Sequence, residues 1–184
     1  IGLPVPRPPI RLVQVGESIR VRGVKEPGVD VTEALHAYGK QSADALEGIS
    51  GYILKRGSPS CGMERVKVYN DKGIPERSGT GLFAHEIIKA HPLLPVEEEG
   101  RLNDPELRDN FITRVYVYAR WKALIESGLS KSALIRFHAS HKYLVMSHST
   151  VMYRQLGQML SDLTRSSLSD IADSYIARLM QTLS

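Results

Sequence analysis

The residues best suited to chemistry form one short stretch, Lys55–Gly62, which reads Lys-Arg-Gly-Ser-Pro-Ser-Cys-Gly and holds the chain's only cysteine. Its glycines and its proline predict a tight loop that presents Ser58, Ser60 and Cys61. A thiol between hydroxyl groups can hold an anion, a metal cluster or a polar substrate. The alternative is an ordinary turn whose single cysteine is buried and structural.

The stretch directly before this loop, Gly51–Leu54, is short, apolar and rich in β-forming residues, and so predicts a buried strand. Ligands bind outside the carboxyl ends of strands in open α/β sheets, which is where the loop would lie. Elsewhere in the first half we expect two short strands or a hairpin over 10–22, helices over about 33–46 and 82–90, strands over 66–69 and 93–96, and a solvated linker over 97–100. This alternation predicts an α/β domain with a largely parallel sheet.

From residue 101 the apolar spacing becomes helical. Pro105 in a first turn and Gly128 at an end bound a helix of about 22 residues. Three more helices are expected: one over about 130–146, one that begins at Ser147 or Ser149, and one over 168–183. One face of the first helix is expected to carry Phe111, Val115, Tyr118, Lys122 and Ile125. The second half is therefore predicted to be an all-α domain.

The net charge of +4 is unevenly distributed along the chain. Residues 1–100 hold 13 basic and 13 acidic residues, whereas residues 101–184 hold 11 basic and 7 acidic ones. Such a local excess suits a polyanionic partner, although a solvated basic helix surface explains it equally well. The excess is densest between Arg108 and Arg154, where we single out as RNA-binding candidates Arg108, Arg114, Arg120, Arg136 and Lys142.

Two aromatic residues in the same region, Trp121 and Tyr143, could stack on bases, or else belong to the helical core. In the first half, Arg7 lies in a stiff, proline-rich segment and could hold a phosphate or a carboxylate. Lys55, directly before the cysteine loop, is the other substrate-binding candidate. His138, His141 and His148 could in principle bind a metal, but packing or RNA contact is the expected role, because no thiolate or carboxylate accompanies them.

Composition limits the class of protein. Apolar runs long enough to span a bilayer and a signal-peptide pattern are both missing, and a single cysteine cannot form an internal disulfide. We therefore expect a cytoplasmic protein without a membrane association, and no protein partner is evident. The chain begins on Ile1 instead of a methionine, so we also expect a segment upstream of it.

Two groups of residues resemble known families. A resemblance to the thiouracil desulfidase family rests on Gly2-Leu3-Pro4, Pro6-Arg7-Pro8-Pro9, Gly28-Val29-Asp30-Val31-Thr32, Leu54-Lys55 and Ser58-Pro59-Ser60-Cys61-Gly62. A resemblance to the YbgA-like domain rests on Arg108-Asp109-Asn110-Phe111, Tyr116, Arg120-Trp121, Phe137-His138, His141-Lys142-Tyr143 and Tyr153. The two in this order resemble the two-domain bacterial tRNA 4-thiouridine desulfidases.

This resemblance implies a Rossmann-like α/β domain over residues 1–98, truncated at its start, and a helical, tRNA-binding domain over residues 99–184 that ends early. It also implies a [4Fe–4S] cluster held by three cysteines, with one iron open to take the substrate's sulfur. Cys61 matches the third of these ligands, and the other two, with a carboxylate that acts as acid and base, are expected upstream of Ile1. Ser58 matches a position that handles substrate and proton transfer, and Ser60 would lie beside the cluster.

The implied function is hydrolytic removal of sulfur from 4-thiouridine in tRNA, which gives uridine. Three alternatives stay open from the sequence. The substrate could be free thiouracil, the protein could be a non-catalytic RNA binder with a structural Cys61, or Cys61 could act alone as a redox or nucleophilic residue.

Overall fold

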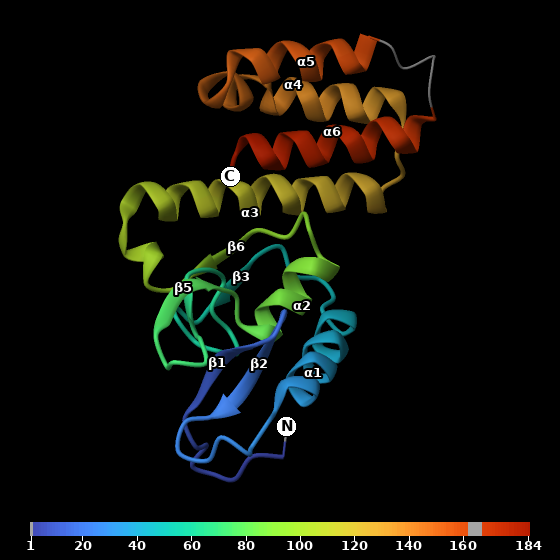
Figure 1. Ribbon diagram of the computed structural model, residues 1–184. Helices are drawn as coiled ribbons and strands as arrows, with labels where there is room; N and C mark the ends of the chain where they lie inside the picture. Colours follow the sequence, from blue (N-terminus) through green and yellow to red (C-terminus); the bar gives the residue numbers. More distant parts are fainter. Residues whose placement is uncertain (1, 162–166) are drawn as a thin grey trace. The chain divides into compact units, whose positions relative to one another are not determined.

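The computed structural model describes residues 2–161 and 167–184. The chain forms two compact units, shown in Figure 1. The first unit comprises the residues up to Pro92 together with Val96–Pro105, and the second comprises Leu93–Pro95 together with Glu106–Ser184. The expected class, a mixed α/β region followed by a helical region, is confirmed.

The larger sheet of the first unit has four strands in the order β2 (Ser18–Gly23), β1 (Ile10–Val15), β4 (Val66–Tyr69) and β5 (Pro75–Gly79). Only β1 and β4 are parallel, while β1 pairs antiparallel with β2, and β4 with β5. The prediction of a largely parallel sheet is therefore wrong for this sheet. The reason is the length of the connections, because two to five residues suffice for a hairpin but not for a parallel crossover.

Strand β5 was not predicted. Its sequence, Pro-Glu-Arg-Ser-Gly, is polar and almost wholly exposed, so it carries no alternating apolar signal. It lies at the edge of the sheet and begins with a proline, which is where a proline is tolerated in a sheet. Its pairing with β4 is imposed by the turn over residues 70–74, where the Asn70 side chain accepts the backbone N–H groups of Lys72 and Ile74.

A second sheet consists of two parallel strands, β3 (Tyr52–Leu54) and β6 (Val96–Glu98). Strand β3 confirms the strand expected before the cysteine loop, but its expected burial is wrong, because only Leu54 is buried and Ile53 is 55% exposed. Strand β6 begins three residues later than the predicted strand over 93–96 and ends two residues later. It includes part of the predicted solvated linker, and that prediction is wrong, because Glu97 and Glu98 are both buried. Carboxylates tolerate burial only with partners, and both have them, as described below.

Helices α1 (Thr32–Asp44) and α2 (Leu82–Ala90) lie side by side in the first unit and confirm the two helices predicted there (Figure 1). Gly39 of α1 faces α2 closely, because a Cβ at this position would lie 2.9 Å from the Cβ of Glu86. Across the same contact, the His36 ring nitrogen Nδ1 lies 2.6 Å from a Glu86 carboxylate oxygen. The core between the larger sheet and α1 and α2 contains Ile10, Leu12, Val21, Val31, Leu35, Val66, Val68 and Leu82.

The second unit contains α3 (Pro105–Glu126), α4 (Lys131–His148), α5 (Thr150–Ser161) and α6 (Leu168–Thr182). All four predicted helices are confirmed. Ser130 and Ser167 each accept a backbone N–H of the following first turn, which satisfies a donor that the helix itself leaves open. Ser149 does the same for Met152 at the start of α5. The helices enclose a core that α6 dominates, with Tyr175, Ile176, Leu179 and Leu183 fully buried.

The structure decides which side of the first long helix is buried. The buried positions of α3 are Phe111, Val117 and Trp121, of which only Phe111 belongs to the face followed by Val115 and Ile125. The apolar residues of this helix surround it almost evenly, so spacing alone could not select the face.

Candidate functional site

The loop after β3 is folded around the Ser58 side chain. Gly57 has a positive φ of 65° and turns the chain away from the strand, as glycine permits. The Ser58 hydroxyl oxygen then accepts the backbone N–H groups of Ser60, at 3.3 Å, and of Cys61, at 3.2 Å. These two contacts fix the position of the thiol relative to the strand end.

Three side chains of this loop form a chain of polar contacts. The Cys61 thiol donates to the Ser60 hydroxyl at 3.5 Å, and the Ser60 and Ser58 hydroxyl oxygens lie 3.1 Å apart. Ser60 is buried, whereas Ser58 and Cys61 are half-buried. The arrangement lets a proton pass between the thiol and two hydroxyls, with the thiol and Ser58 within reach of a ligand.

The start of α2 clamps the loop in place. Gly81 donates its backbone N–H to the Gly62 carbonyl at 2.8 Å, and Ala84 donates to the Ser60 carbonyl at 3.1 Å. A Cβ at Gly81 would lie 2.4 Å from the Ser60 carbonyl carbon, so only glycine allows this approach. The loop is therefore held on two sides, by the strand that precedes it and by a helix start 20 residues further along the chain.

Tyr52 lies within electrostatic reach of the thiol. Burial raises the pKa of the Tyr52 phenol, and the Cys61 and Tyr38 side chains raise it further. The phenol therefore keeps its proton at neutral pH. Sequence analysis did not select Tyr52, although its place in the strand directly before the loop was a usable signal.

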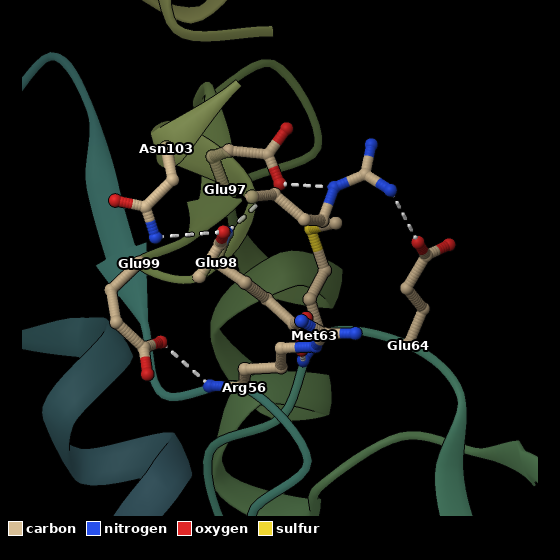
Figure 2. A network of polar contacts seen from close by, with 9 residues as sticks. Arg56, Met63, Glu64, Glu97, Glu98, Glu99 and Asn103 are labelled. Atoms are coloured by element: carbon tan, nitrogen blue, oxygen red, sulfur yellow. Dashed lines mark hydrogen bonds and ion pairs between the residues drawn. The ribbon is translucent and has the colours of Figure 1, made fainter.

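Carboxylates at the end of β6 support the same loop, and Figure 2 shows them as a connected network. Glu98 accepts the backbone N–H of Met63 at 2.9 Å. Glu99 accepts the backbone N–H of Arg56 at 2.7 Å and pairs with the Lys55 ammonium at 2.5 Å. Lys55, expected to bind substrate, is thus placed at Glu99, and this lysine lowers the pKa of the Glu99 carboxyl.

A third carboxylate, Glu97, joins this network through Arg101. The Arg101 guanidinium donates to Glu97 at 2.7 Å and to Glu64 at 3.0 Å (Figure 2). Glu97 also accepts the backbone N–H of Glu98. Sequence analysis missed this whole network, because a run of three glutamates is usually a solvated surface and nothing in the run itself shows which partners bury it.

A [4Fe–4S] cluster requires more thiolates than these residues supply. Cys61 is the chain's only cysteine, and the described residues contain no group of three or more His, Cys, Asp and Glu side chains that could hold a metal ion. One thiolate and two hydroxyls do not fit a cluster that is held by three or four cysteines. We therefore derive no catalytic step through such a group.

The basic candidates of the second unit differ in exposure. Arg108, Arg120 and Arg136 are exposed, and Arg114 is half-buried. The Lys142 ammonium lies 5.0 Å from the centre of the Tyr143 ring, and Tyr143 is 66% exposed. These two residues form a surface suited to a base and a phosphate. In the first unit, the candidate Arg7 is exposed as well.

Trp121 is 5% exposed and packs edge-on against Phe137, with ring centres 5.2 Å apart. The expectation that Trp121 contacts RNA is therefore wrong. Trp121 belongs to the helical core, which was the alternative interpretation. The buried ring has no face left for a base.

Two of the three histidines are also accounted for by packing. The buried His141 places Nδ1 2.7 Å from the Phe137 carbonyl, and His138 places Nδ1 3.1 Å from the Tyr175 hydroxyl.

Comparison with known proteins shows the family of the chain. The family model of 2-thiouracil desulfurase matches residues 1–99, which is more than half of the chain. The chain therefore belongs to the 2-thiouracil desulfurase family.

A second family model, a domain of unknown function designated DUF1722, matches residues 142–184. The chain is also similar to the uncharacterized protein YbgA of Escherichia coli strain K12, at 29% identity over 84 residues, 45% of this chain and 50% of that protein. The chain thus spans about half the length of this curated relative. No solved structure matches. The expected fusion of a desulfidase domain with a YbgA-like domain is confirmed.

Within residues 2–161 and 167–184, helices with the length and apolar character required to cross a membrane are absent.

Proposed function

We propose that the protein removes sulfur from 4-thiouridine in tRNA and leaves uridine. In this hydrolysis a carbon–oxygen bond to water forms, the carbon–sulfur bond breaks, and sulfur leaves as hydrogen sulfide. The oxidation state of the carbon does not change, so the net reaction needs no external oxidant or reductant.

The observation that carries the proposal is the contact chain from Cys61 through Ser60 to Ser58, in a domain of the desulfurase family. A hydroxyl both accepts and donates a proton, so Ser60 can take the thiol proton and return one to a leaving sulfur. Ser58 is committed through its oxygen to two backbone N–H groups, which leaves its own proton free to be donated.

The RNA part of the proposal is supported by the second unit. Its exposed guanidinium groups at Arg120 and Arg136 can neutralise phosphates, and Tyr143 with Lys142 offers an exposed ring beside a charge. A base within folded tRNA must leave its stack to be modified, so a separate unit that holds the RNA has a clear purpose.

The proposal includes an iron–sulfur cofactor only if cysteine ligands from outside these 184 residues bind the cluster together with Cys61. Cys61 would then supply one thiolate. When bound, the cluster would supply a Lewis-acidic iron with affinity for sulfur. Iron uptake that depends on Cys61 is the observation that would support this role.

A second candidate function is the desulfuration of free 2-thiouracil, favoured by the description of the matching family. The two candidates are separated by supplying each substrate to the same protein. Loss of the thiocarbonyl absorbance in 4-thiouridine-containing tRNA, with little turnover of free 2-thiouracil, supports the proposal. Turnover of the free base alone supports the second candidate, and turnover of neither contradicts both.

The contribution of the second unit is tested with a double variant, Arg120→Ala with Lys142→Ala. We expect weaker tRNA binding and a shallower salt dependence. The matched control, Lys131→Ala with Arg178→Ala, removes two exposed cations of the same unit and should bind like the parent. Equal binding by both double variants would show that this surface does not hold tRNA.

A further inference from the structure

The first unit contains a pocket of about 580 Å³ that the site above leaves unexplained. Gly57 and Pro59 of the cysteine loop form part of its wall. The rest of the wall comes from strands β1, β4 and β5, together with Val24, Arg56, Glu64, Arg65, Glu98 and Arg101. Its volume lies in the range of about 300–1,000 Å³ that is usual for ligand sites. The pocket thus adjoins the loop that carries Cys61.

Positive charge dominates the lining of this pocket. Its carboxylates are Glu64 and Glu98, and its cations are Arg11, Arg56, Arg65, Lys67, Arg77 and Arg101. Both carboxylates already have partners, since Glu64 pairs with Arg101 and Glu98 accepts the Met63 N–H. Of the six cations, only Arg101 forms an ion pair with a described residue. The six cations exceed the two carboxylates by four, so the lining keeps a net positive charge.

Three of these cations form a row across neighbouring strands. Lys67 of β4 lies directly opposite Arg77 of β5. In the parallel pair of β1 and β4, Leu12 is in register with Val68, which aligns Arg11 with Lys67. Like charges in such positions repel each other, and the row extends about 10 Å across the sheet. A row of this kind is stabilised by a ligand that carries several negative charges.

Two details of the lining are typical of a binding site. The Arg11 guanidinium lies 5.0 Å from the centre of the Tyr69 ring, and its buried Nε has no hydrogen-bond partner among the described residues. Arg65 has a φ of 54°, the only positive value at a described non-glycine residue. Unsatisfied donors and backbone strain of this sort concentrate at binding sites.

We propose that this pocket binds backbone phosphates of RNA beside the Cys61 loop, so that the desulfurase unit holds the substrate independently of the helical unit. The inference rests on the proposed action on RNA. Several unpaired cations along a row match a phosphodiester chain better than a single carboxylate, which one guanidinium would satisfy. The guanidinium groups supply bidentate contacts to phosphate oxygens, and Lys67 supplies a point charge.

The test is RNA binding by the full chain that carries Lys67→Ala with Arg77→Ala, two exposed side chains whose removal also relieves repulsion. The control variant, Lys40→Ala with Lys89→Ala, removes the same charge from α1 and α2, outside the pocket. The probe is an unmodified tRNA transcript, measured by fluorescence anisotropy between 50 and 200 mM salt. We expect the pocket variant to bind more weakly than the control and its salt slope to fall by about 1.4–1.8, the value for two lost phosphate contacts.

Equal affinities and equal salt slopes for the two variants would contradict RNA binding by the pocket. Binding of uridine monophosphate to the parent as tightly as the transcript would also contradict it. A thermal melt of both variants verifies folding. Turnover of 4-thiouridine tRNA by the parent separately tests the proposed function. If the parent turns over 4-thiouridine tRNA but both variants bind the transcript equally, only RNA binding by the pocket is refuted. If the parent shows no turnover but the pocket variant alone binds more weakly, only the proposed function is refuted.

Discussion

The Glu98 carboxylate accepts the backbone N–H of Met63 at 2.9 Å, although 35 residues separate them in the chain. Glu98 is 3% exposed, so this contact joins the buried end of β6 to the residue two positions after Cys61. The same strand supplies Glu97 to Arg101, and the following residue, Glu99, bonds to Arg56. The loop that carries the chemistry is therefore anchored by β6 as well as by α2.

The anchoring role of Glu98 predicts a stability defect. Glu98→Ala leaves the Met63 N–H without its partner, and we expect the free energy of unfolding to fall by about 1–3 kcal/mol. Glu98→Gln keeps an oxygen acceptor and should lose less. Urea denaturation measures both variants, with Glu76→Ala on the exposed edge strand as the control, expected to change by less than about 0.5 kcal/mol. Equal stability of all three variants would contradict the anchoring role.

The thiol and the two serines are predicted to have separable roles. Cys61→Ser should abolish desulfuration. Ser60→Ala, which removes the partner of the thiol, should lower kcat by about 10²-fold or more if the hydroxyl transfers a proton. Ser58→Ala should also lower the melting temperature, because two backbone N–H groups lose their acceptor. Steady-state kinetics and thermal melts check these outcomes, and Ser78→Ala on exposed β5 is the control. An active Ser60→Ala variant would exclude the proton transfer.

The two aromatic candidates of the second unit are predicted to have different roles, Trp121 in stability and Tyr143 in tRNA binding. Trp121→Ala removes a buried ring and should lower the free energy of unfolding by about 3–5 kcal/mol. Tyr143→Ala should leave stability within about 0.5 kcal/mol but weaken tRNA binding, because a stacked base contributes about 1–3 kcal/mol. Denaturation and binding titrations on both variants test this. A Tyr143→Ala variant that binds tRNA like the parent would show that the exposed ring is not a stacking surface.

The stability of the second unit is predicted to depend on pH. Burial lowers the pKa values of His138 and His141, and the charges of Lys142 and Arg120 respectively lower them further. If Nδ1 of His141 donates to the Phe137 carbonyl, protonation would place a charged, unpartnered N–H at the buried Nε2. The unfolded chain takes up these protons first, so stability is fully present above a pH of about 6.5 and is lost as the pH falls below it.

Denaturation at pH 5 and pH 7.5 measures this loss. His141→Gln should reduce the difference between the two values, and His148→Gln, at an exposed position of the same helix, should not. An unchanged pH dependence in the His141→Gln variant would show that this ring is not the responsible group.

Sequence patterns recovered the helices well, because each of them carries its own signals. Ser130 and Ser167 mark helix starts, and α2 ends where His91-Pro92 forbids continuation. The failures that concern burial have one cause. Burial of Glu97 depends on Arg101 and that of Trp121 on Phe137, and neither partnership leaves a mark in the local composition.

By itself the sequence determined the order of the elements, the cysteine loop with its hydroxyl residues and the family resemblance, since all of these reside in neighbouring residues. Only the tertiary structure decided which carboxylates hold that loop, which aromatic ring is exposed, and that cations from β1, β4, β5 and the end of β6 line a single pocket. Such contacts join residues tens of positions apart, and they depend on strand register and burial, which short-range spacing does not specify.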